Sequence, residues 1–108
     1  MDFDSYQQAA RKTALYADAY RITYPALGLA SEAGEVAGKV KKVLRDRGGD
    51  VGDDQRAAIG DELGDVLWYV AILAADLGLS LETIAAGNIE KLRSRLERGA
   101  IQGDGDQR

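Results

Sequence analysis

The chain has 108 residues, which suits one domain with one core, and its net charge of −4 at pH 7 disfavours a nucleic-acid polymer as partner, because gripping a phosphate backbone needs clustered cations. It has no cysteine and no histidine, which excludes disulfides, thiolate or histidine metal sites and histidine-dependent nucleophiles, so any chemistry depends on oxygen ligands and on Lys or Arg. It shows no apolar leader and no long uncharged run, and we therefore expect a cytoplasmic protein that does not bind membranes.

A first helix is predicted from about Tyr6 to Ile22. Ser5 and Gln8 have the spacing of a capping box at its start, and Thr23-Tyr24-Pro25 is expected to interrupt it. A second helix is predicted over residues 26–47, where it ends in a basic run that suits the helix dipole and at a pair of glycines. The segment that follows is expected to form a loop.

A third helix is predicted over residues 54–77. Ser80 can cap a fourth helix that extends to Arg98, and the tail over residues 99–108 is too rich in Gly and Asp to be regular. Apolar residues recur with the helical period of about 3.6, and no segment alternates convincingly with the period of about 2 that strands need. We therefore predict one all-α domain over residues 1–108, an antiparallel bundle of about four helices that is completed by oligomerisation.

One acidic pattern occurs in both central helices. The pattern is Glu-x-Gly-acid-Val, and its acids are Glu32, Glu35, Glu62 and Asp65. The apolar stripes beside these acids are Leu29, Ala33, Val36, Val40 and Val43 in the second helix, and Ile59, Leu63, Val66, Val70, Leu73 and Leu77 in the third. Packing the stripes together would bring all four carboxylates to one rim, because both acid pairs lie on the same side. Gly34 and Gly64 each cost about 1 kcal/mol relative to alanine, which close approach of a helix or ligand would offset.

Carboxylates this close repel one another unless a cation lies among them. Mg²⁺ typically takes one or two carboxylates together with waters and phosphate oxygens. The pattern therefore predicts a site for Mg²⁺, with Mn²⁺ as a substitute, and a phosphate-bearing ligand. The alternative is that these acids are ordinary solvated residues on two amphipathic helices.

Longer segments around the acids resemble one known family. They are Gly28-Leu29-Ala30-Ser31-Glu32-Ala33-Gly34-Glu35-Val36, Asp61-Glu62-Leu63-Gly64-Asp65-Val66-Leu67-Trp68-Tyr69, and Asn88-Ile89-Glu90-Lys91-Leu92 with Arg95. These segments resemble the small single-domain type of the MazG-like nucleoside triphosphate pyrophosphohydrolase family, as does the Gly-Asp-Gly-Asp sequence of the tail. The resemblance covers roughly residues 6–106. It implies an all-α homodimer or homotetramer that uses Mg²⁺ to cleave a (d)NTP between its α- and β-phosphates, giving a nucleoside monophosphate and pyrophosphate.

The expected reaction is attack of a metal-activated water on the α-phosphorus, with all four acids in catalytic and metal-binding roles. Glu32 or Glu62, which lie nearer the apolar stripes, are the better candidates for the general base. The resemblance leaves open whether the task is house-cleaning of non-standard nucleotides or a reaction specific for dUTP or dCTP.

Three residues of the fourth predicted helix are candidates for binding the substrate. Asn88, Lys91 and Arg95 lie three to four positions apart and form a row of donors suited to phosphate oxygens. Spacing alone fits a solvated helix surface equally well, and the family resemblance favours a function for Asn88 and Lys91.

Residues of the two central helices are also candidates. Lys42 lies on the acid side of the second helix and can contact phosphates, whereas Lys39 on the same side is expected to pair with Glu35. Trp68 is predicted to lie opposite the core stripe of the third helix, where it would contact a base or a subunit interface, or fill a second side of the core.

Two non-catalytic interpretations compete with hydrolysis. A helical oligomerisation or regulatory module would use the acids as surface charge and show no Mg²⁺-dependent turnover. A metal-binding, antitoxin-like protein would bind ions without releasing pyrophosphate.

Overall fold

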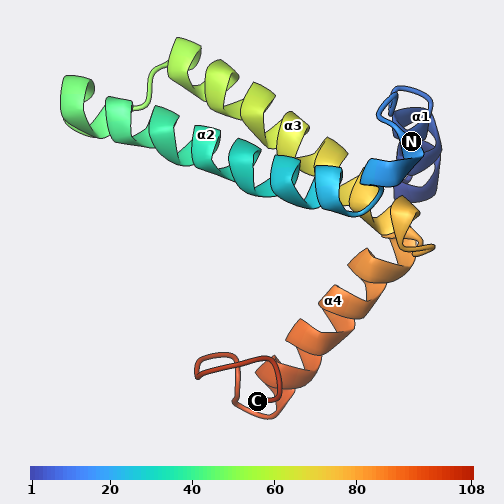
Figure 1. Ribbon diagram of the computed structural model, residues 1–108. Helices are drawn as coiled ribbons and strands as arrows, with labels where there is room; N and C mark the ends of the chain where they lie inside the picture. Colours follow the sequence, from blue (N-terminus) through green and yellow to red (C-terminus); the bar gives the residue numbers. More distant parts are fainter.

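The structure is a computed structural model that describes residues 1–108, and all of its regular elements are helices (Figure 1). They are α1 (Phe3–Arg11), the 3₁₀ helix η1 (Asp18–Tyr20), α2 (Thr23–Arg47), α3 (Asp53–Asp76) and α4 (Leu81–Glu97). The predicted all-α class is confirmed.

The two long helices α2 and α3 form an antiparallel hairpin that dominates the molecule (Figure 1). The chain leaves α2 at Gly48, whose φ of 61° is in the left-handed region, and Gly49 also has a positive φ of 90°. Glycine adopts these angles without the steric cost that other residues meet there. The predicted end of the second helix at this glycine pair is therefore confirmed.

The predicted first helix is wrong in its extent. Asp2 is the N-cap of α1, because its Oδ1 accepts a hydrogen bond of 2.8 Å from the Ser5 amide, while Ser5 Oγ accepts one of 3.1 Å from the Asp2 amide. The capping box is thus formed by Asp2 and Ser5 rather than by Ser5 and Gln8. The helix ends at Arg11, and Leu15 beyond it is 90% exposed.

The segment between α1 and α2 is held by Asp76 at the end of α3. The Asp76 Oδ2 atom accepts hydrogen bonds from the Tyr16 hydroxyl at 2.6 Å and from the Ile22 amide at 2.9 Å. Ile22 has a φ of 68°, and the Thr23 amide donates to the Arg21 carbonyl at 2.7 Å, which closes a strained γ-turn. These contacts end the segment with a sharp turn where a continuous helix was predicted.

The helix α2 starts at Thr23, so Thr23-Tyr24-Pro25 begins a helix rather than interrupting one. Proline is accepted in a first turn because the missing amide hydrogen has no partner there.

A small core lies where α1 crosses the end of the hairpin. Its buried members are Ala10, Ala71, Ile72 and Leu81. Gln7 is buried beside them and joins α1 to the other helices, since its Nε2 donates to the carbonyls of Ala71 and Leu79 at 3.1 and 3.0 Å. Its Oε1 accepts from the Leu81 amide at 3.1 Å.

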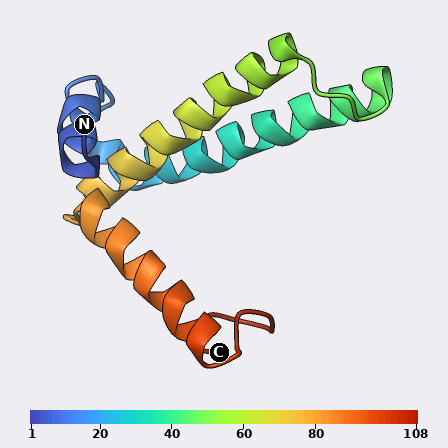
Figure 2. The same ribbon diagram turned by 180° about the vertical axis from the view of Figure 1, so that it is seen from behind.

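The last helix leaves the hairpin at a steep angle. Ser80 caps α4 as predicted, with its Oγ accepting from the Thr83 amide at 3.2 Å. The axes of α3 and α4 differ by 106°, and α4 extends away from the hairpin (Figure 2). The tail is irregular, as predicted, but it folds back on α4. No single helix has the length and apolar composition needed to cross a membrane, and α3 with α4 meets that test only as a bent pair.

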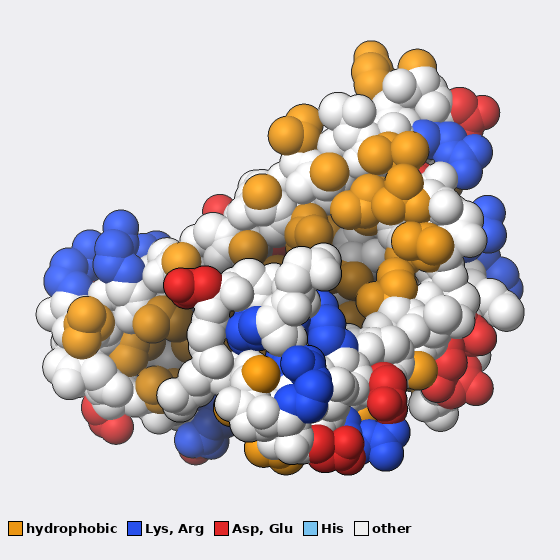
Figure 3. Space-filling view, turned by 90° about the horizontal axis from the view of Figure 1, so that it is seen from below, with side chains coloured by type: hydrophobic (Ala, Val, Ile, Leu, Met, Phe, Trp, Pro, Cys, Tyr) orange, Lys and Arg blue, Asp and Glu red, His pale blue; other side chains and the backbone are white.

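Much of the apolar surface is uncovered within one chain. Figure 3 shows apolar side chains gathered on the face seen from below. The predicted stripes are buried only in part: Val43 is buried, whereas Leu63 is 54% and Val40 50% exposed. The buried residues of α3, which include Ala71 and Ile72, lie off the predicted stripe because α1 covers a different side of the helix. Only nine of the 108 residues are buried.

Candidate active site

Three acids from two helices meet in the hairpin. Glu32 of α2 and Glu62 and Asp65 of α3 each offer one carboxylate oxygen, and these oxygens lie within 4.8 Å of one another. The helical period directs each acid pair along one face, and antiparallel packing of α2 on α3 makes the two faces meet. The sequence thus correctly placed three of the four acids together. Glu35 is exposed and is not part of this group.

The electrostatics of the group favour a cation. Partial burial raises the pKa of Glu32, and the carboxyls of Glu62, Asp65 and Glu35 raise it further. Glu32 resists ionisation because it is partly buried among other acids. A divalent cation bound there would offset the repulsion between the carboxylates. Half-buried and exposed carboxylate oxygens from both helices therefore fit a hard divalent ion.

Lys39 supplies the positive charge that the structure places beside these acids. Its Nζ lies 3.6 Å from Glu62 Oε1. The predicted pairing of Lys39 with Glu35 is wrong, because packing against α3 offers Lys39 an acid on the other helix that sequence spacing cannot reveal.

Aromatic rings lie along the interface on one side of the acids. The Tyr69 ring covers Gly28, where an added Cβ would lie 2.1 Å from Tyr69 Cε1. The Tyr24 ring centroid is 6.3 Å from that of Tyr69. Burial raises the pKa of Tyr69, with Tyr24 and the charges of Glu32 and Asp65 acting in the same direction. This cluster was not predicted from the sequence, although Tyr24, Gly28 and Glu32 share one face at helical spacing.

A cavity of about 530 Å³ lies on the other side of the acids, towards the turn of the hairpin. It is lined by Lys39, Lys42, Val43, Asp46, Arg47, Asp54, Gln55, Ala58 and Ile59. Lys42 therefore lines the same hollow as Lys39, whose ammonium faces Glu62.

The remaining predicted site residues lie elsewhere in the chain. Asn88, Lys91 and Arg95 belong to α4, which extends away from the acids (Figures 1 and 2). Trp68 packs against the core between α1 and α3, and its Nε1 donates to Thr13 Oγ1 at 2.8 Å. Of the alternatives for Trp68, this position matches the second side of the core.

The glycines of the acidic pattern have open space around them. A Cβ at Gly34 or Gly64 would meet no atom within 4 Å. The close approach of a helix that these glycines predicted does not occur within the chain. Gly28 is the helix position where another element of the chain does approach that closely.

Comparison with known proteins decides the family. The model of the MazG nucleotide pyrophosphohydrolase domain matches residues 24–99. The chain belongs to this family. It is 47% identical to the Gene 37 protein of Mycobacterium phage L5 over the full length of both chains. It is 38% identical to the uncharacterized protein YvdC of Bacillus subtilis (strain 168) over 74 residues, which are 64% of this chain and 70% of YvdC. No solved structure matches the chain.

The family resemblance inferred from the acidic motifs is thus confirmed. MazG domains are helical and typically depend on divalent metal, and they act on nucleoside triphosphates, so membership indicates a nucleotide pyrophosphohydrolase. The MazG match spans α2, α3 and α4 and therefore includes all four acids of the repeated pattern. Most of the C-terminal tail lies beyond it.

Proposed function

We propose that this MazG protein hydrolyses (d)NTPs to a nucleoside monophosphate and pyrophosphate with Mg²⁺, for which Mn²⁺ can substitute. The observation that carries the proposal is the convergence of Glu32, Glu62 and Asp65 from two helices. Such an activity suits the removal of non-standard nucleotides.

The acids share two tasks in this proposal, binding the ion and accepting a proton. Glu32, Glu62 and Asp65 would hold the ion, and Glu35, which lies on the same side of α2, would complete the set. A bound divalent ion supplies charge for the phosphate oxygens and lowers the pKa of a water. Glu32 or Glu62, both half-buried, accepts a proton from the water whose oxygen attacks the α-phosphorus. The bond from that phosphorus to the α,β-bridging oxygen breaks, and pyrophosphate leaves.

Cations and an aromatic edge bind the rest of the substrate. Lys42, in the cavity beside the acids, contacts phosphate oxygens. Trp68 contributes by positioning Tyr69, because the two rings meet edge to face at a centroid distance of 4.9 Å. The result is a path along the hairpin with rings on one side of the acids and, on the other, a hollow whose lining includes three cations and two acids.

The donors on α4 require a second copy of the chain. Asn88 and Lys91 lie on α4, which leads away from the hairpin, so we propose that they approach the triphosphate in the site of a partner. The exposed apolar residues, among them Leu27 and Leu44, at 68% each, supply surface for such contact. The proposal therefore includes a homodimer or homotetramer.

The test is a panel of standard and damaged (d)NTPs with Mg²⁺, following pyrophosphate and monophosphate. Glu62→Gln is expected to lower kcat/KM by more than about 100-fold, since losing even an outer partner of a metal ligand costs about 10–100-fold. Asp61→Asn is the matched control, because this exposed acid on the same helix is outside the three-acid group.

Two outcomes would refute the proposal, and a third would narrow its substrate. Unchanged turnover in Glu62→Gln would show that this group of acids is not the catalytic site. Absence of pyrophosphate from every nucleotide, together with tight ion binding, would indicate a metal-binding protein without hydrolysis. Turnover of dUTP or dCTP alone would restrict the substrate while leaving the site intact.

A further inference from the structure

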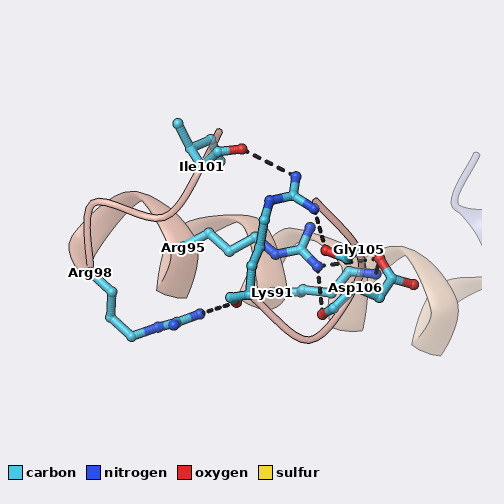
Figure 4. Close-up of polar contacts among 7 residues, drawn as sticks. Lys91, Arg95, Arg98, Ile101, Gly105 and Asp106 are labelled. Carbon is cyan, nitrogen blue, oxygen red and sulfur yellow. Dashed lines mark hydrogen bonds and ion pairs between the residues drawn. The ribbon is translucent and has the colours of Figure 1, made fainter. Parts of the chain in front are cut away.

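The residues after α4 form a loop that side-chain hydrogen bonds hold against the helix. Residues 99–108, called here the Asp106 loop, turn back along α4 and are held by several side chains (Figure 4). Gly103 and Gly105 have φ values of 136° and 78°, which only glycine adopts without strain. Arg108 donates to the carbonyls of Gly105 and Ile101, and Arg98 donates to the Arg108 carbonyl at 2.9 Å.

The side chain of Arg95 holds this loop in place. It is 4% exposed, and its Nη2 donates to the Asp106 carbonyl at 2.7 Å and to Asp106 Oδ1 at 3.2 Å. A guanidinium buried beneath the loop is committed to holding it. Arg95 therefore supports the loop, and its buried guanidinium is not among the donors that α4 offers to a substrate.

Lys91 is a cation of this cluster that stays open to a ligand. Its Nζ lies 3.3 Å from Asp106 Oδ1, and its side chain is 40% exposed. A lysine ammonium has three donor hydrogens, so one contact with Asp106 leaves donors free for an anion. A lysine held at one point also has fewer conformations to lose when an anion binds.

We infer that Asp106 is a positioning residue: it holds the ammonium of Lys91 in the direction in which this group meets the triphosphate. The inference rests on the proposed function, which assigns Lys91 to phosphate oxygens. In this inference Asp106 contacts no substrate and acts through Lys91, although its carboxylate also pairs with Arg95 at 3.2 Å. Its backbone carbonyl, by contrast, anchors the loop on Arg95, so the side chain can be changed without removing that anchor.

The experiment measures kcat and KM of the full chain with Mg²⁺ and the best nucleotide of the panel. Asp106→Asn keeps the Arg95 contact with the backbone but loses the charge opposite Lys91. We expect KM to rise about two- to fivefold, the scale of an exposed ion pair, with kcat nearly unchanged. Asp106→Glu should restore most of the loss. Asp104→Asn, a change in the same loop at an acid with no ion pair, is the control and should behave as wild type.

A double mutant separates positioning from folding. Lys91→Ala is expected to raise KM by about tenfold or more, and adding Asp106→Asn to it should change nothing further, because Asp106 then has no lysine to position. A KM unchanged in Asp106→Asn, or an additive double mutant, would overturn the inference while leaving the role of Lys91 intact. A lower KM in Asp106→Asn would overturn it as well, since it would show Asp106 competing with phosphate. An unchanged KM in Lys91→Ala would instead refute the proposed role of Lys91 itself.

Discussion

Gly28 sets how closely α2 and α3 approach beside the acids. The Tyr69 ring occupies the space that a side chain would fill, and this ring lies between Tyr24 and the acidic group. A single hydrogen at one α-carbon thus positions an aromatic wall of the candidate site. Gly28 belongs to the motif that suggested the family, but only its packing partner shows why a glycine is needed there.

Gly28→Ala is expected to destabilise the protein by about 1–3 kcal/mol, the usual cost of overpacking. Tyr69 would also shift, so turnover should fall. Urea unfolding measures the stability. Gly60→Ala is the matched control: it lies inside α3 with no atom within 4 Å of an added Cβ, and it is expected to stabilise by up to about 1 kcal/mol. Equal stabilities of the two variants would show that Tyr69 yields without cost.

At the scale of elements, Gln7 fixes where α4 begins. Its side chain contacts α3, the turn after it and the first residue of α4 by hydrogen bonds. The helices α1 and α4 are thereby tied to the hairpin. This buried amide therefore helps to set the direction of α4, and with it the position of Lys91, together with Leu81 in the core and the hydrogen bond from Ser80 to Asp4.

Gln7→Ala is expected to lower the free energy of unfolding by about 2–4 kcal/mol, because buried backbone groups lose their partners. Thermal and urea unfolding test this. Gln8→Ala, an exposed change one residue along the same helix, should remain within about 0.5 kcal/mol of wild type. A Gln7 variant as stable as the Gln8 variant would mean that water replaces the amide.

The Asp106 loop should respond to acid. Hydrogen bonds from Arg95 and Lys91, together with their charges, hold the pKa of Asp106 below its ordinary value. A lowered pKa in the folded state means that the contact is fully present above the ordinary value, about 3.9, and is lost as pH falls through the lowered one. Amide exchange of residues 99–108 should therefore accelerate only below about pH 4. Asp106→Asn should abolish this acceleration at low pH. An acceleration of equal size in that variant would mean that another group causes it.

At the scale of the whole molecule, one chain leaves too much apolar surface uncovered. With nine buried residues in 108, the core is small, and α4 exposes Ile89 at 63% and Leu96 at 68%. Large exposed apolar surface of this kind marks an interaction surface. A second copy is the partner that would also bring the donors of α4 to the acids.

Light scattering is expected to show a dimer or tetramer for wild type. Ile89→Glu places a charge on the outer face of α4, so it should lower the mass and the turnover together while leaving the helix content unchanged. Glu97→Gln, near the end of the same helix, should leave both unchanged. A monomeric wild type with full activity would refute the proposed assembly.

The sequence by itself determined the helices after residue 23, the cap at Ser80, the acidic pairs and the family, because helical period, glycines and caps are local properties. It also placed Glu32, Glu62 and Asp65 on faces that can meet. It could not find the break after Arg11, since Asp76, far along the chain, holds that turn.

Tertiary structure alone decided which acid Lys39 faces, why Gly28 is a glycine, and that the tail closes over Arg95. These features depend on contacts between residues distant in sequence. Helical period fixes which side of a helix a residue lies on, but the partner on that side is chosen by packing.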